Sequence, residues 1–182
     1  MAILEIKEYG EPVLRGKALP VKEITPEILN LIQDMTETMY ADSGVGLAAP
    51  QVGVSKRIIL VDEEEDGLIV MINPMIIKSE GEFTAEEGCL SVPGIYSQVK
   101  RSSKVTVKAL NENGDPIEIT KEGLTARALQ HEIDHLNGIL FVDRIGRMER
   151  QILLNKLKKK KQFKKGDKQP LSSSPLPSEG EG

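Results

Sequence analysis

The spacing of hydrophobic residues predicts three helices. Apolar residues from Ile28 to Met39 recur at helical spacing after a Thr-Pro pair typical of a helix start, and they predict a helix over residues 26–41. The same periodicity predicts a second helix over about residues 124–136, where Asn137-Gly138 is a good C-terminal stop. We expect a third helix over residues 147–162, which end in a run of lysines.

Between the first two helices the chain has the pattern of β-strands. Residues 57–62 and 68–74 are rich in Ile, Val and Leu, and an acidic turn between them predicts two antiparallel strands. Residues 104–109 alternate between polar and apolar, and an Asn-Gly pair supplies a hairpin turn before residues 117–120. Residues 141–145 are expected to be extended. Strands in the middle and helices toward the ends indicate an α+β fold.

The composition is that of a folded domain. Aromatic residues make up only 3% of the 182 residues, so the core has to be built from Leu, Ile, Val and Met. No apolar run has the length of a membrane span, and the first residues lack the pattern of a signal peptide. A single cysteine excludes an internal disulfide, so we expect a reducing, cytoplasmic location. We expect one domain over residues 1–162 and a disordered tail, rich in Ser, Pro and Gly, over residues 163–182.

The charge is divided unevenly along the chain. From Arg147 onward there are 10 Lys or Arg and 4 Asp or Glu, so the overall charge of −4 leaves −10 on residues 1–146. An acidic body should not bind DNA or an anionic membrane. The lysines of the third helix could contact ribosomal RNA near emerging nascent chains, and the alternative is a solvated helix end.

The chemistry is concentrated in QHEIDH, which contains both histidines of the chain. On a helix, His131 and His135 lie on one face and Glu132 flanks it. This is the H-E-x-x-H pattern, which supplies two nitrogen ligands for a metal ion and a general base for water on that ion. Leu124 and Ala128 extend the same face one to two turns back, where they could wall a substrate pocket. The alternative is a chance match to a short motif.

A third metal ligand has to come from another part of the chain. The extended metalloprotease pattern fails, because its last histidine position is Phe141. Glu149 is a possible ligand, although the adjacent Arg147 and Arg150 favour a surface ion pair. Cys89, in EEGCLS, is the other candidate, because a thiolate is a good ligand for Zn²⁺ or Fe²⁺. A buried structural cysteine and a catalytic nucleophile are its alternatives.

A third stretch, GVGLAAPQVG, covers residues 44–53. It is not a dinucleotide-binding loop, because its third glycine position is Ala49, and no Gly-Lys-Ser/Thr follows. It is either a tight glycine-rich connection or a backbone that pairs with an extended peptide, with Gln51 directed into the site.

Taken together, GVGLAAPQ (44–51), EGCLS (87–91) and QHEIDH (130–135), in this order, resemble peptide deformylase. The ordered set is far more specific than any one motif, and the likeness runs from about Ile3 to about Leu157. The resemblance implies an α+β fold in which antiparallel β-sheets pack around a central helix carrying H-E-x-x-H, with a C-terminal helix.

The resemblance also implies a metal-dependent reaction. Its substrate would be the N-formylmethionine at the start of a new polypeptide, and formate would be released. Cys89, His131 and His135 would bind one divalent metal ion, typically Fe²⁺ in the cell, with Zn²⁺, Ni²⁺ or Co²⁺ able to replace it. Glu132 would be the general acid and base.

The same resemblance implies how the substrate is held. The side-chain amide of Gln51 and the backbone N–H of Leu90 would form an oxyanion hole for the formyl oxygen. The backbone at Val45 and Gly46 would pair with the nascent peptide, and a hydrophobic pocket would accept the methionine side chain.

Two other functions stay open from the sequence. One is a zinc endopeptidase with a downstream carboxylate as third ligand, and the other is a non-enzymatic metal-binding or translation-associated module. Two side chains also raise questions. Arg127 could border the substrate pocket or point outward beside Asp134, and Glu87 is expected to pair with Arg101, with Lys100 or solvent as the alternative.

Overall fold

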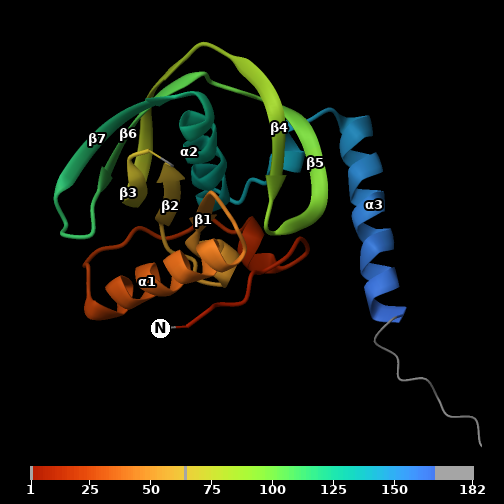
Figure 1. The fold of residues 1–182 in the computed structure, drawn as a ribbon, viewed down its shortest axis with the longest axis horizontal. Helices are drawn as coiled ribbons and strands as arrows, with labels where there is room; N and C mark the ends of the chain where they lie inside the picture. The colour runs from red at the N-terminus through yellow and green to blue at the C-terminus, as the bar shows by residue number, and fades with distance from the viewer. Residues whose placement is uncertain (1, 64, 167–182) are drawn as a thin grey trace, which may run out of the picture.

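Helix α2 (Gly123–Leu136) occupies the centre of the molecule, between two antiparallel sheets (Figure 1). The computed structural model describes residues 2–63 and 65–166. In that part of the chain the other helices and 3₁₀ turns are η1 (Pro12–Arg15), α1 (Pro26–Ala41), η2 (Ala49–Val52), η3 (Phe141–Arg144) and α3 (Arg147–Gly166). The strands are β1 (Gly46–Ala48), β2 (Ile58–Glu63), β3 (Gly67–Glu80), β4 (Phe83–Cys89), β5 (Val92–Arg101), β6 (Lys104–Leu110) and β7 (Pro116–Glu122).

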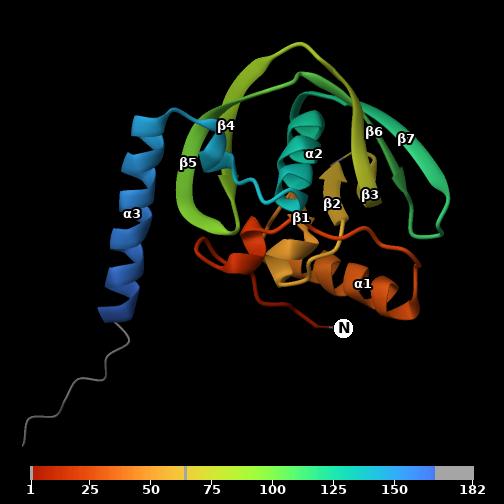
Figure 2. The ribbon, with the colours of Figure 1, turned by 180° about the vertical axis from the view of Figure 1, so that it is seen from behind.

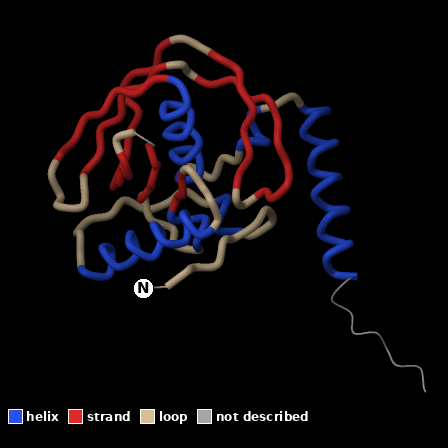
Figure 3. Tube along the Cα trace, in the orientation of Figure 1, coloured by secondary structure: helices blue, strands red, loops and turns tan. Residues whose placement is uncertain are grey.

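The larger sheet has the strand order β1-β2-β3-β6-β7, and β4 pairs with β5 in a separate two-stranded sheet. All these pairs are antiparallel. The strands curve around α2, so the helix is enclosed by both sheets (Figure 3). Strand β1 is one edge of the larger sheet, which leaves its outer side without a strand partner among the described residues.

Strand β2 is buried on both of its faces. Ile58 and Leu60 pack in the cluster that contains α1, while Ile59 and Val61 pack in the cluster that contains α2. A strand covered on both sides appears in the sequence as a continuous apolar run rather than an alternating one. This explains the run of four apolar residues at the start of β2.

Helix α2 presents an apolar side to the larger sheet and a polar side to β4. Ala126, Leu129, Ile133 and Leu136 belong to the apolar cluster between helix and sheet. The polar residues from Arg127 to His135 are also buried, so they need hydrogen-bond partners inside the protein. The polar side of this helix is therefore the place where a functional site can form.

Helix α3 lies alongside β5 on the outside of the molecule (Figures 1 and 2). Leu157 is buried with residues of β5 and η3. Lys160 Nζ donates to the Gly94 carbonyl at 2.9 Å, and Lys161 Nζ donates to the Tyr9 carbonyl at 2.7 Å. Two lysines of the basic run therefore hold the helix to the body. Over the described residues, no helix combines the length and the apolar character needed to cross a membrane.

The predicted helices and the α+β class are confirmed, with two differences. Residues 141–144 form the 3₁₀ turn η3 rather than an extended segment, because Asp143 Oδ2 accepts the Leu140 N–H at 2.9 Å and closes the turn. Helix α3 continues to Gly166, four residues beyond the expected boundary at residue 162. The remainder of the predicted tail, residues 167–182, lies outside the described residues.

Candidate active site

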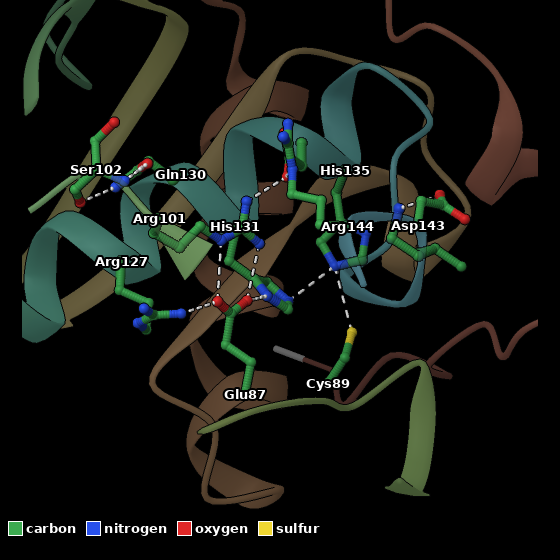
Figure 4. Close-up of polar contacts among 12 residues, drawn as sticks. Glu87, Cys89, Arg101, Ser102, Arg127, Gln130, His131, His135, Asp143 and Arg144 are labelled. Carbon is green, nitrogen blue, oxygen red and sulfur yellow. Dashed lines mark hydrogen bonds and ion pairs between the residues drawn. The ribbon is translucent and has the colours of Figure 1, made fainter. Parts of the chain in front are cut away.

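Three potential metal ligands meet where the end of β4 approaches α2 (Figure 4). Cys89 Sγ lies 3.3 Å from His135 Nε2, which lies 3.3 Å from His131 Nε2. Ligand atoms around a tetrahedral Zn²⁺ are roughly 3.3–3.6 Å apart, as its bond lengths to nitrogen and sulfur require. The ligand atoms of Cys89, His131 and His135 are all within 4.8 Å of one another, so the three residues fit one cation.

Glu149, the other candidate for third ligand, does not reach this site. It accepts a hydrogen bond from Ser97 Oγ at 2.5 Å, between α3 and β5. The carboxylate therefore joins α3 to the body and does not face the histidines.

The ring of His131 is held by Glu87. His131 Nδ1 lies 2.8 Å from Glu87 Oε1, and a proton on Nδ1 leaves Nε2 as the nitrogen available to a cation. Arg101 donates to both oxygens of Glu87, at 2.8 and 2.9 Å, so the expected pairing of these two residues is confirmed. Burial alone would raise the pKa of Glu87, but Arg101 and His131 hold it well below its usual range. Glu87 is therefore an anion inside the protein.

Of the two positions that the sequence left open for Arg127, the outward one beside Asp134 is wrong. The side chain is buried and donates through Nη1 to Glu87 and, at 3.1 Å, through Nη2 to the Phe83 carbonyl. Asp134 instead accepts from Arg101 at 2.5 Å and from Arg144 at 2.5 and 2.7 Å. Three arginines and two carboxylates thus form one network behind His131, which is buried except at Arg144.

Glu132 is buried beside the two histidines. Its Oε2 atom has no hydrogen-bond partner among the described residues. Burial raises the pKa of Glu132 to about 7, although the nearby His131 acts in the opposite direction. A carboxyl with a pKa near neutrality can both accept and return a proton.

Strand β1 passes directly against this carboxyl group. A Cβ built on Gly46 would lie 2.6 Å from Glu132 Oε1, closer than real Cβ contacts. Only glycine allows the strand and the carboxylate to lie this close together. The glycine-rich stretch is therefore part of the site and not simply a tight connection.

The side-chain amide of Gln51 is oriented by its neighbours. The Ala48 N–H donates to Gln51 Oε1 at 2.9 Å, so the amide nitrogen points the other way. Gln51 Nε2 donates to Ser91 Oγ at 3.2 Å and lies 3.5 Å from Cys89 Sγ. The sequence analysis did not predict a role for Ser91, although its position in EGCLS, two residues after Cys89, could have indicated that it lies at the site. Leu90, between Cys89 and Ser91, packs its side chain against the α1 cluster.

The residues expected to contact substrate differ in their exposure and in their distance from the ligand cluster. Val45 is exposed at the start of the edge strand, and its carbonyl accepts the Asp62 N–H at 2.8 Å. Ala128 is half-buried and packs against the α2 cluster. Leu124 is 78% exposed at the start of α2, about 10 Å along the helix from His131. The structure does not bring Leu124 to the ligand cluster.

A histidine pair on a buried helix, a thiol from the neighbouring strand and a buried carboxyl define the site of a metal-dependent hydrolase. The family model for polypeptide deformylase matches residues 3–151. The chain is 60% identical over 154 residues to the peptide deformylase of Halothermothrix orenii, covering 84% of this chain and 100% of that one. It is 58% identical over 151 residues to that of Carboxydothermus hydrogenoformans, covering 83% and 99%.

Solved structures give the same result. A peptide deformylase from Legionella pneumophila superimposes with a TM-score of 0.86 at 48% identity, covering 93% of this chain and 100% of that chain. One from Synechococcus elongatus, in complex with actinonin, has a TM-score of 0.82 at 44% identity and covers 87% of each chain. The chain belongs to the peptide deformylase family. It is a metal-dependent enzyme that removes the N-formyl group from newly made polypeptides.

Proposed function

We propose that Cys89, His131 and His135 bind the metal ion of this deformylase and that the ion is Fe²⁺ in the cell, with Zn²⁺, Ni²⁺ or Co²⁺ able to replace it. The convergence of one sulfur and two ring nitrogens supports this assignment. Thiolate and imidazole donors suit these late transition metals rather than Mg²⁺ or Ca²⁺. When bound, the cation supplies Lewis acidity to the attacking water and the formyl carbonyl.

Glu132 moves the proton in this proposal. Its unpaired Oε2 accepts a proton from the attacking water and later delivers it to the amine that leaves. Formate and a free N-terminal methionine are the products.

Gln51 Nε2 and the backbone N–H of Leu90 donate to the formyl oxygen as negative charge grows on it. The contacts of Gln51 with Ala48 and Ser91 support this role, because they fix the amide before substrate arrives. A donor that is already in place costs no reorganisation during the reaction.

The outer side of β1 binds the peptide. Backbone groups at Val45 and Gly46 pair with the substrate as an added strand, which the edge position of β1 supports. Ala128, and Leu124 at the exposed end of the helix, are proposed to contact the substrate side chain. The position of Leu124 makes it the weaker of the two, so Leu124→Ser should change KM less than Ala128→Ser.

A formate-release assay with formyl-Met-Ala-Ser tests the proposal. Glu132→Ala should retain the metal and lose turnover, whereas Cys89→Ser should weaken metal binding. Normal deformylation by Glu132→Ala would remove Glu132 from its role, and unchanged metal affinity in Cys89→Ser would remove Cys89 from the ligand set. Cleavage of an unformylated protein instead of formate release would favour a zinc endopeptidase.

We also propose that residues 1–162 form one catalytic domain, that the enzyme is cytoplasmic, and that α3 contacts ribosomal RNA. Lys156, Lys158 and Lys159 support the last point, because they are exposed while Lys160 and Lys161 bind the body. Co-sedimentation with ribosomes should weaken as salt is raised and after charge removal at these three exposed lysines. Binding that ignores salt would contradict the RNA contact.

A further inference from the structure

The two elements that carry the proposed ligands belong to different parts of the fold. His131 and His135 lie on α2, whereas Cys89 is the last residue of β4. Among the described strands β4 pairs only with β5, and its register shifts between Glu87 and Cys89. Sheet hydrogen bonds therefore do not set the position of Cys89 relative to α2. Side-chain contacts between β4 and α2 have to do so.

Arg127 makes such contacts at both ends of β4. From α2, one turn before His131, its Nη1 donates to Glu87 near the end of the strand. Its Nη2 donates to the carbonyl of Phe83, the first residue of the strand, at 3.1 Å. The guanidinium also lies over the Phe83 ring, 4.4 Å from its centroid. One side chain thus joins the helix to the strand at two separated points, and Figure 4 shows the one at Glu87.

Burial makes these contacts strong. The side chains of Arg127 and Glu87 are 5% and 6% exposed, so water and salt screen the pair very little. The contact also reaches a proposed ligand, because Glu87 Oε1 is the partner of His131 Nδ1. A carboxylate that holds a ligand histidine fixes its ring orientation and the nitrogen that faces the ion.

We infer that Arg127 is a positioning residue: it fixes the cysteine-bearing strand against the histidine-bearing helix and, through Glu87, orients His131. This inference rests on the proposed ligand set. Arg127 touches neither the reacting atoms nor the three ligands, and it acts through the spacing of Cys89 Sγ from the two ring nitrogens. Arg127 therefore affects how tightly, and with what geometry, the proposed ligands bind the metal ion.

Removal of Arg127 should not unfold the protein. Glu87 would keep both hydrogen bonds from Arg101, which is anchored on the other side by Asp134. The network would then have two arginines for two carboxylates, so no buried carboxylate would be left without a cation. Arg127→Met keeps an unbranched apolar side chain but lacks the guanidinium, so it loses the contacts with Glu87 and with Phe83. Arg127→Lys keeps a charge but lacks the fork that reaches two acceptors.

The test compares Co²⁺ binding to metal-free protein, followed by the absorption of the thiolate–cobalt bond. Arg127→Met should bind Co²⁺ about 10-fold more weakly than the unmodified protein, the lower end of the effect of losing a direct partner of a ligand, because Arg127 acts on His131 through Glu87. Its absorption band should shift, and Arg127→Lys should fall between the two. Arg150→Ala is the control. It removes an arginine–carboxylate contact that does not involve Glu87, that of Arg150 Nη2 with Asp143 Oδ1 at 3.0 Å, and it should leave both the affinity and the absorption band unchanged.

A second readout needs no metal. In the metal-free protein, amide hydrogen exchange along β4 should be faster in Arg127→Met than in the unmodified protein, while exchange along β2 stays the same. Unchanged Co²⁺ affinity, spectrum and β4 exchange would overturn the inference. If Arg127→Met does not fold, Arg127→Lys decides, and an affinity equal to that of the unmodified protein overturns it. If the unmodified protein binds Co²⁺ without a thiolate band, the proposed ligand set fails instead.

Discussion

Gly46 and Glu132 are in direct steric contact: a Cβ on residue 46 would lie 2.6 Å from Glu132 Oε1 and 3.0 Å from its carboxyl carbon. The edge strand that is proposed to bind the peptide and the carboxyl that is proposed to move the proton therefore position one another. The contact brings the proposed peptide-binding strand and the proposed proton acceptor side by side, although the two residues are far apart in the chain.

Gly46→Ala should therefore lower kcat/KM by about 100-fold, because a displacement near 1 Å of a reacting group has effects of this size. Steady-state formate release measures it. Gly16→Ala is the matched control, since a Cβ at Gly16 meets nothing within 4 Å, and its kinetics should be unchanged. Equal kinetics for Gly46→Ala and the unmodified enzyme would show that the carboxyl does not need its present position.

Gln51→Ala should lower kcat by about 100- to 1,000-fold with a smaller change in KM, because the lost donor acts mainly on charge that develops in the transition state. Ser91→Ala is a graded comparison. It removes the 3.2 Å hydrogen bond that helps to orient the amide but leaves the amide present, so its loss should be smaller. A larger loss in KM than in kcat for Gln51→Ala would assign Gln51 to ground-state binding instead.

The sequence predicted the elements whose pattern is local. Helix α1 has the predicted bounds, because its Thr-Pro start and its apolar spacing are both contained in a short stretch. Strands β4 and β5 were missed: β4 is largely polar, and β5 contains Pro93 and Gly94. Both strands are defined by pairing with each other and by packing against η3 and α3, which no short window of sequence reveals.

In the candidate site, too, the features set by local sequence were predicted and those set by contacts distant in sequence were not. The spacing of His131 and His135 was visible in the sequence, and the pairing of Glu87 with Arg101 was expected from the need of a buried carboxylate for a cation. The position of Arg127 was not predictable from a helical wheel. The wheel gives the direction in which a side chain leaves its helix, but a long side chain ends where its partners lie, here Glu87 and Phe83.

Removal of the metal should abolish formate release, and added Ni²⁺ or Co²⁺ should restore it. The Fe²⁺ form should lose activity in aerobic buffer while the Ni²⁺ form persists, because Fe²⁺ and an adjacent thiolate are both open to oxidation. Activity followed over time in air and under nitrogen measures the difference. Equal decay of the two metal forms in air would contradict an iron site with a thiolate ligand.

The ion pair of Asp143 with Arg15 should make stability depend on acid pH. Burial alone would raise the pKa of Asp143, but the hydrogen bonds from Arg15 and from the Leu140 N–H outweigh it and lower this pKa below its usual value. A lowered pKa in the folded state means that the stabilisation is fully present above the pKa of the unfolded chain and is lost as pH falls through the folded value. Asp143→Asn removes the charge and keeps an oxygen for the Leu140 N–H.

The side chain of Arg15 is 39% exposed, so solvent screens its ion pair with Asp143. Asp143→Asn should therefore lower the free energy of unfolding near neutral pH by about 1 kcal/mol. Urea unfolding from about pH 7 down to about pH 3 should show the two proteins converging at the acid end. A difference that stays constant over this range would show that the charge of Asp143 does not contribute.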